Sequence, residues 1–143
     1  MTTQQTQAGR KSYGSAALTN GIRVVASPMF LAEQSDPGAR RFLFAYRIRI
    51  TNEGTTGAQL MSRRWLIVNA HGQRDEVEGE GVVGQQPYLA PGESFEYSSY
   101  CPLNTPWGTM EGAYIFEREG GEVFEATIAR FYLVAPERAA DGA

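Results

Sequence analysis

The sequence has 143 residues, of which 42% are hydrophobic and 20% are charged, and its formal net charge is -3. These values are typical of a single globular domain, and the acidic balance argues against nucleic acid as a partner. One cysteine excludes an internal disulfide, and no apolar run approaches the ~20 residues of a membrane span, so we expect a cytoplasmic protein without membrane association.

Both ends of the chain are polar, and we expect them to lie outside the folded domain. Residues 1–12 are rich in Gln and Thr and have no apolar core of the kind that a signal peptide needs. Residues 136–143 are similarly poor in large apolar side chains. The predicted domain therefore covers residues 13–135, between two disordered tails.

Alternating apolar and polar residues predict several β-strands in the first half of the domain. Residues 21–28 are rich in β-branched side chains and end at a proline. Residues 41–52 place aromatic and aliphatic side chains on one face and arginines on the other, which predicts a half-buried strand. Residues 60–69 contain a continuous apolar run, typical of a more deeply buried strand. The charged residues 73–78 predict a strand at an edge of a sheet.

The second half continues this pattern. Residues 95–99 alternate after a Pro-Gly turn, and residues 113–118 and 123–134 flank Gly120-Gly121, a strong hairpin signal. Within the last strand the apolar residues change parity, and a one-residue bulge near Ala129-Arg130 would keep them all on the core face. With no amphipathic helix in any window, about seven strands predict an all-β fold, an antiparallel β-sandwich.

A literal G-x-G-x-x-G occurs at residues 79–84. In dinucleotide-binding folds this string follows a strand and opens a helix, whose N-terminus meets the pyrophosphate. Here Pro87 and Pro91 follow shortly after the motif, and two prolines this close leave no room for that helix. The motif therefore does not indicate a Rossmann fold.

Two explanations of these glycines remain open. They could occupy positive-φ positions in a tight loop or let backbones approach closely. Alternatively, the backbone N–H groups of Gly79, Gly81 and Gly84 could form a concave anion site, with Arg63 as the counter-charge. The ligand would then be a phosphate-containing small molecule. Because Arg63 and Arg64 are adjacent on a strand, only one of them can face such a site.

No group of residues in the sequence indicates catalysis, a cofactor or a bound metal. Cys101 has no neighbouring base to activate its thiol, and a single histidine, His71, cannot form an acid–base pair. Glu76, Glu78 and Glu80 alternate along one strand, which is typical of a solvated face. We therefore expect a protein without enzymatic activity.

Aromatic residues gather among prolines and glycines between residues 97 and 116. We expect a loop here with Trp107 near its tip, and an exposed aromatic residue on a rigid loop is a common interface anchor. The candidate interaction residues are Trp107, Met110 and Tyr100; the alternative is that they complete the core. Charges on the predicted edge strand, residues 73–78, favour a monomer or a weak homodimer.

Several short blocks, in this order and spacing, resemble the ApaG family, also called CorD in bacteria. The match runs from about Ile22 to Pro136, although Tyr100 and Ala129 stand where the family more often has glycine and proline. The most specific blocks are Ser62 to Trp65, Gly79 to Pro87, Leu89 to Tyr97, Cys101 to Leu103, Thr105-Pro106 and Gly108 to Gly112.

This resemblance implies a fibronectin type III-like sandwich. It also links the chain to cobalt resistance and magnesium efflux in bacteria, and to eukaryotic domains that look like interaction modules in F-box proteins and a polymerase delta-interacting protein. No catalytic activity is established for the family, whose glycine motif has invited proposals of nucleotide or pyrophosphate binding. We therefore expect a protein–protein interaction module with an unidentified protein partner. The alternative is a protein that binds phosphate, pyrophosphate or a nucleotide, or senses a divalent ion, through residues 79–84.

Overall fold

The computed structural model describes residues 13–136, which form nine β-strands and two short 3₁₀ helices. In chain order they are β1 (Ser15–Thr19), β2 (Ile22–Phe30), η1 (Ala32–Gln34), η2 (Pro37–Ala39), β3 (Phe42–Asn52), β4 (Ala58–Asn69), β5 (Arg74–Glu80), β6 (Tyr88–Leu89), β7 (Ser94–Leu103), β8 (Trp107–Arg118) and β9 (Val123–Val134). The predicted N-terminal tail, and all of the predicted C-terminal tail except Pro136, lie outside the described residues. Within the described part, no helix has the length and apolar character needed to cross a membrane.

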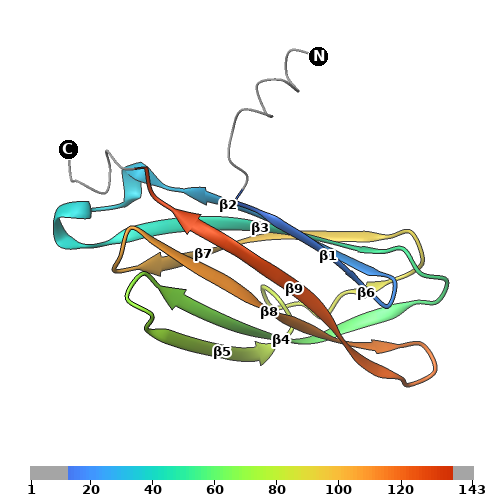
Figure 1. Cartoon of the computed structure of the whole chain (residues 1–143). Coiled ribbons are helices and arrows are strands. Elements are labelled where there is room, and N and C mark those ends of the chain that lie inside the picture. The colour runs from blue at the N-terminus through green and yellow to red at the C-terminus, as the bar shows by residue number, and fades with distance from the viewer. Residues whose placement is uncertain (1–12, 137–143) are drawn as a thin grey trace, which may run out of the picture.

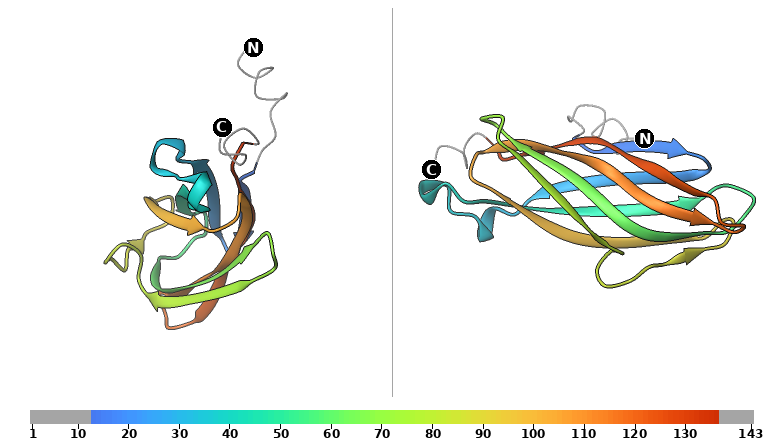
Figure 2. Two further views of the ribbon diagram at one scale, coloured as in Figure 1. Left: turned by 90° about the vertical axis from the view of Figure 1, so that its left-hand side faces the viewer. Right: turned by 90° about the horizontal axis from the view of Figure 1, so that it is seen from below.

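The strands form two antiparallel sheets that pack face to face, so the predicted all-β sandwich is confirmed (Figure 1). One sheet has the order β1-β2-β3-β7, and the other has the order β5-β4-β8-β9 with the short β6 paired to β4. The strands run along the long axis of the molecule, and the view down that axis separates the two layers (Figure 2). The charged strand β5 lies at a sheet edge, as its composition predicts.

Period-two alternation builds the core between the sheets. The predicted inward face of β3 is buried along its length, and the aromatic side chains of the two sheets meet at Trp65. The ring centroid of Trp65 lies 5.4 Å from that of Tyr46 and 5.9 Å from that of Phe131. Because Tyr46 belongs to one sheet and Trp65 to the other, this edge-on contact fastens the two layers together.

The predicted bulge in the last strand is confirmed. The ladder between β8 and β9 shifts register between Met110 and Gly112, so that Glu111 faces both Ala129 and Arg130. The shift returns the apolar residues after the bulge to the core face. Gly112 is required here, because a Cβ at this position would lie 1.9 Å from a backbone oxygen of β4.

The sheets are joined along one side of the sandwich by contacts between β9 and the N-terminal strand, which we call the seam. The backbone N–H of Tyr132 donates to the carbonyl of Tyr13 at 2.9 Å. The hydroxyl of Ser15 donates to the carbonyl of Ala129, inside the bulge, at 2.7 Å. The other two edge strands, β5 and β7, border the opposite side of the sandwich.

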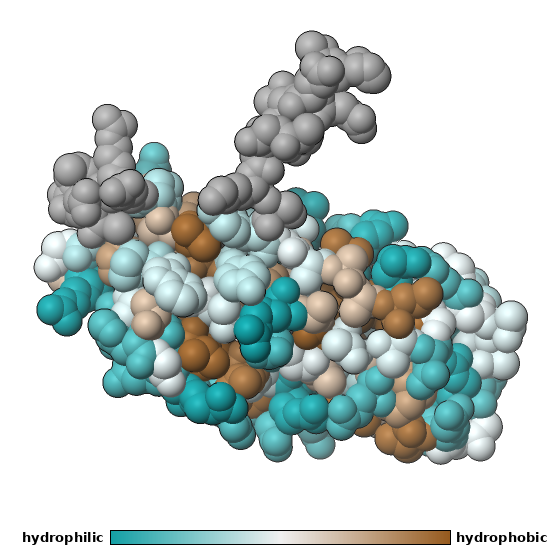
Figure 3. Space-filling view, viewed as in Figure 1, coloured by the Kyte–Doolittle hydropathy of each residue, from teal (hydrophilic) through white to brown (hydrophobic). Residues whose placement is uncertain are grey.

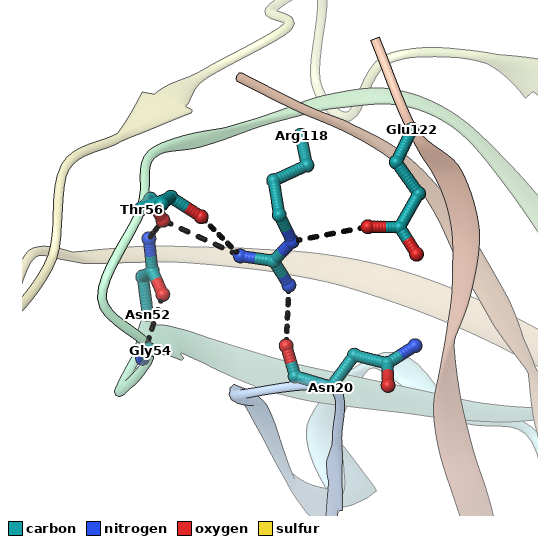
Figure 4. Close-up of polar contacts among 6 residues, drawn as sticks. All are labelled: Asn20, Asn52, Gly54, Thr56, Arg118 and Glu122. Carbon is teal, nitrogen blue, oxygen red and sulfur yellow. Dashed lines mark hydrogen bonds and ion pairs between the residues drawn. The ribbon is translucent and has the colours of Figure 1, made fainter. Parts of the chain in front are cut away.

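Arg118, at the end of β8, ties together the loops at one end of the sandwich (Figure 4). Its guanidinium donates to the Asn20 carbonyl in the β1–β2 turn and to the Thr56 hydroxyl at 3.1 Å in the β3–β4 loop. The same side chain pairs with Glu122 at 3.8 Å and stacks over the Phe124 ring. Three connections from both sheets are therefore held by one cation.

Asn52 holds the β3–β4 loop from within the core, next to Arg118 (Figure 4). Its side chain is fully buried, and its amide nitrogen donates to the carbonyls of Thr56 and Leu89, each at 2.9 Å. Its amide oxygen accepts from the backbone N–H of Gly54 at 2.9 Å. One side chain therefore bonds three backbone groups, two in the β3–β4 loop and one in β6.

Replacing Asn52 by Ala should lower the free energy of unfolding by about 2–3 kcal/mol, because the buried amide no longer bonds the carbonyls of Thr56 and Leu89 or the N–H of Gly54. Urea denaturation of both proteins measures the difference. Asn104→Ala is the control: Asn104 is exposed and accepts one side-chain hydrogen bond, from Asn69. Its loss should stay near 0.5 kcal/mol, roughly the range of surface changes. Equal losses in the two variants would contradict the role assigned to Asn52.

Candidate functional site

A groove of about 630 Å³ opens between the sheets on the side away from the seam. Its walls are the inward-facing side chains of β4 and β5 from one sheet and β7 from the other. The central lining residues are Arg63, Trp65, Ile67, Val77, Ser99 and Cys101. A concave and largely apolar site with a few polar groups is the usual form of a binding site in proteins.

Arg63 and Arg64 point to opposite faces of β4, as the strand geometry predicts. Arg64 lies on the outer face and pairs with Glu125 at 3.1 Å, and this contact raises the pKa of the guanidinium. Arg63 lines the groove, where one of its nitrogens donates to the carbonyls of Glu80 at 3.0 Å and Gly81 at 2.8 Å. The structure therefore brings Arg63 and the glycine motif together.

Gly79 leaves room for Arg63. A Cβ at this position would lie 2.8 Å from a terminal nitrogen of Arg63 and 2.9 Å from its central guanidinium carbon. The guanidinium thus lies flat over the bare backbone of β5. No carboxylate within residues 13–136 forms an ion pair with it, although most arginines of this part of the chain have one.

The other two glycines of the motif serve the turn that follows β5. Gly81 has a φ of +64°, and a Cβ there would lie 2.3 Å from the carbonyl oxygen of Gln85. Val83 and Gly84 have φ values of +42° and +79° and form a two-residue turn. Two central residues with positive φ are the mark of a type I′ turn, which favours glycine at its second position.

Several backbone N–H groups of this turn already donate hydrogen bonds to carbonyl groups of the protein. The N–H of Gly81 donates to the Met61 carbonyl at 2.9 Å, and Val82 and Gln85 exchange two hydrogen bonds of 2.8 Å. The chain then enters the short strand β6 rather than a helix. An anion at this position would therefore meet the guanidinium of Arg63 more readily than a cradle of three glycine amides.

The groove is lined by Tyr97 and the single cysteine, and behind Tyr97 lies the fully buried Tyr114. The hydroxyls of Tyr97 and Tyr114 form a hydrogen bond with each other, and burial raises the pKa of both. Burial, reinforced by the charge of Asp75, raises the pKa of the Cys101 thiol to about 12. Because the thiolate is the reactive form, this cysteine is a poor nucleophile at neutral pH.

The structure does not bring the three predicted interaction residues together. Trp107 and Tyr100 are 45% and 65% exposed, but they lie on strands of different sheets, and Met110 is only 1% exposed. The predicted loop is also wrong, because β7 and β8 continue through most of it. Pro102 fits into β7 since it lies at a sheet edge, where no ladder hydrogen bond is lost, and Pro106 lies in the short turn.

The outer surface presents no continuous apolar area on the face in Figure 3, where its described residues are visible. Hydrophobic residues form separate patches among hydrophilic ones, as on most monomeric proteins. Glu76, Glu78 and Glu80 lie exposed on β5, as predicted for a solvated face. In the part of the chain that the structure describes, no three His, Cys, Asp or Glu side chains are grouped to hold a metal ion.

The sequence indicates Arg63 and the glycine motif as candidate site residues, but it does not indicate the groove. The period-two pattern places Trp65 and Ile67 on one face of β4, and Tyr97 and Cys101 on one face of β7. Only the pairing of distant strands shows that these two faces oppose each other and that both lie at open edges. The missing signal is thus the strand order, which local patterns do not contain.

Residues 32–118 match the protein-family model described as the ApaG domain. The match extends from η1 to the end of β8 and so includes every strand that lines the groove.

Similar proteins cover most of the chain. The Protein ApaG of Anaeromyxobacter sp. (strain K) is 57% identical over 122 residues, which is 85% of this chain and 96% of that protein. Protein ApaG of Methylobacterium nodulans is 52% identical over 84% of this chain and 92% of its own length. A crystal structure of a candidate ApaA protein from Bordetella pertussis superposes with a TM-score of 0.79 at 46% identity, covering 90% of this chain and 99% of that one.

Replacing Val83 by Asn should raise the free energy of unfolding by about 0.5–1 kcal/mol, because a β-branched residue at positive φ is strained and Asn tolerates this region. Val83 is 55% exposed, so little apolar burial is lost. Urea denaturation measures the change. In the control Val123→Asn, at an exposed position of β9, stability should fall or stay unchanged. A fall in both variants would show that the turn stores no strain.

Proposed function

Because this chain belongs to the ApaG domain family, whose matched region contains the groove, we propose that it is a protein–protein interaction module without enzymatic activity. In this proposal a segment of a partner protein binds in the groove between β5 and β7. The observation that carries the proposal is the groove itself, whose apolar floor at Trp65 and Val77 is bordered by two strand edges. Such sites commonly receive peptide segments of other proteins.

The chemistry inside the groove also supports binding rather than catalysis. Its thiol, Cys101, stays protonated at neutral pH, and the hydroxyl of Tyr97, which lines the groove, bonds to that of the buried Tyr114. These hydroxyls also keep their protons, since burial raises the pKa of each tyrosine. The groove therefore offers apolar contacts and fixed hydrogen-bonding groups, which suit recognition.

The resemblance of the sequence to the bacterial family associates such a module with cobalt resistance and magnesium efflux. In our proposal the chain contributes to this role in the cytoplasm by binding its partner protein. The chain acts as a monomer or a weak homodimer, since the charges along β5 oppose pairing at that edge.

A second candidate function is the binding of a phosphate-containing small molecule beside residues 79–84. Arg63 favours it, because this guanidinium reaches the groove and forms no ion pair with a carboxylate of residues 13–136. The hydrogen bonds within the turn limit what the backbone could add. In this candidate function Arg63 is the main anion ligand, and Gly79 provides the space that holds it in place.

Filling the groove should abolish partner binding. Ser99 lines the groove from β7, and Ser99→Trp places a large ring over its floor. Captured proteins from a cell lysate, quantified by mass spectrometry, should fall at least about 10-fold relative to the wild type, the loss expected when a central contact is blocked.

The matched control is Ser27→Trp, on the exposed outer face of β2, which should capture the same proteins as the wild type. Trp107→Ala tests the exposed face of β8 in the same assay. Undiminished capture by Ser99→Trp would rule out the groove as the binding surface, and a loss confined to Trp107→Ala would place binding on β8.

Titration with pyrophosphate, nucleotides and divalent cations tests the second candidate function. Amide NMR shifts at millimolar ligand should then concentrate at residues 79–84, and Arg63→Met should abolish them because the main cationic ligand is gone. Spectra without shifts in this segment would exclude anion binding at the turn. Shifts that persist in Arg63→Met would exclude Arg63 as the ligand.

A further inference from the structure

The edge of β7 that faces away from β3 carries unpaired backbone groups. At the paired positions Leu43 and Pro102, Leu43 bonds away from β7: its N–H donates to Ser35 at 2.9 Å and its carbonyl accepts from Leu31 at 2.9 Å. In an antiparallel ladder such positions alternate with hydrogen-bonded ones. The even-numbered residues of β7 therefore direct their backbone groups to the free edge. They are Ser94, Glu96, Ser98, Tyr100 and Pro102.

This edge lacks the usual protection against strand pairing along its centre. Charged side chains and prolines are the common means of blocking an edge strand. On β7 the one proline lies near the end, the one charged residue, Glu96, pairs with Arg49 of β3 at 2.6 Å, and the centre carries two serines, Ser98 and Ser99. By contrast, the edge strand β5 across the groove carries an aspartate and three glutamates in seven residues. The edge of β7 is thus the more suitable of the two for adding a strand.

A strand added to β7 would lie over the mouth of the groove. Its side chains would alternate, so that every second one points between the sheets. The floor below this position is apolar and comes from Trp65, Ile67 and Val77. The shape and polarity of the groove therefore match a segment with apolar residues at alternate positions.

Charge distinguishes the two ends of the groove. At one end Arg74 and Asp75 are neighbours of opposite sign. At the other end Arg63 has no carboxylate partner within residues 13–136, and it lies near Tyr97, where its charge opposes the rise in the pKa of the hydroxyl caused by burial. A carboxylate on the occupant would complement this end.

We propose that the partner segment binds as an extended strand antiparallel to β7, with alternate apolar side chains in the groove and a carboxylate at Arg63. This inference rests on the proposed function, because it describes how the same groove takes its partner. Arg63 lies beside the first half of β7, so an antiparallel strand brings its C-terminal end there. The carboxylate is either the C-terminus of the partner or an Asp or Glu side chain near that end.

The test uses the chain of 143 residues and a random library of synthetic peptides about eight residues long, within the usual range of strand lengths. Each peptide is made with a free C-terminal carboxylate and with a C-terminal amide. Peptides enriched on the immobilised wild type are then measured by fluorescence anisotropy against Ser98→Pro, Glu78→Pro and Arg63→Met.

Ser98→Pro removes an N–H from the free edge of β7 without removing a ladder bond to β3. It should weaken binding about 10-fold or more, since the ring also hinders the incoming strand. Glu78→Pro is the matched control, because alternation along β5 places its N–H on the other free edge. It should leave affinity unchanged.

Arg63→Met should lower the affinity for peptides that carry the carboxylate about 10-fold, because one charge-assisted hydrogen bond is lost. If the C-terminus supplies the carboxylate, free-acid peptides bind more tightly than amides, and this preference disappears in Arg63→Met. If a side chain supplies it, both forms bind equally and the enriched peptides share an Asp or Glu near the C-terminal end.

Backbone methylation of an enriched peptide provides a check that does not depend on how Ser98→Pro folds. N-methyl groups at one alternating set of positions should abolish binding, and the other set should be tolerated, because only one edge of the added strand meets β7. Equal tolerance of both sets would overturn strand addition, as would equal affinity for the wild type and Ser98→Pro.

Two further results separate this inference from the proposed function. Some peptides could lose binding to the Ser99→Trp variant but bind the Ser98→Pro variant as tightly as the wild type. That result would keep the groove as the binding site and overturn strand addition. Peptides that Ser99→Trp binds normally, or a library from which none is enriched, would overturn both.

Discussion

Hydrogen bonds between β9 and the N-terminal strand close the sandwich along one side, and the rest of the architecture depends on this seam. The bulge in β9 turns the carbonyl of Ala129 toward Ser15, so a local irregularity in one sheet becomes a contact with the other. With one side fastened and Trp65 filling the centre, the sheets leave a groove on the opposite side. The position of the groove, where we propose that a partner binds, therefore follows from where the two sheets are joined.

Local sequence patterns contain much of this fold and only part of its site. Alternation along β3 predicts its buried face, and the parity change in β9 predicts the bulge at Ala129-Arg130; both predictions are confirmed. The sequence indicates that Asn52 lies at a turn. It does not indicate the buried hydrogen bond from Asn52 to the carbonyl of Leu89, because Leu89 lies far away in the chain. For the same reason the groove could not be predicted, since it depends on strands from two sheets.

The glycine motif illustrates how one string of letters can have several physical causes. Gly79 makes space for a side chain, Gly81 avoids a clash with a carbonyl, and Gly84 completes a tight turn. None of these structural roles involves the N-terminus of a helix. In dinucleotide-binding folds the same motif binds the pyrophosphate at such a helix N-terminus. The prolines after the motif were sufficient to exclude, from the sequence alone, the helix that a dinucleotide-binding fold requires. The close approach of Arg63 to Gly79 required the structure.

The seam also constrains when the protein can become complete during its synthesis. Ser15 and Ala129 are 114 positions apart, so β9, which closes the sandwich, leaves the ribosome after all the other strands that the structure describes. Until then the nascent chain lacks Phe131 and Leu133, both fully buried in the finished core. Contacts between such distant residues slow folding and prolong the exposure of apolar surface. Until β9 is made, the apolar faces of the strands that precede it stay partly exposed to solvent.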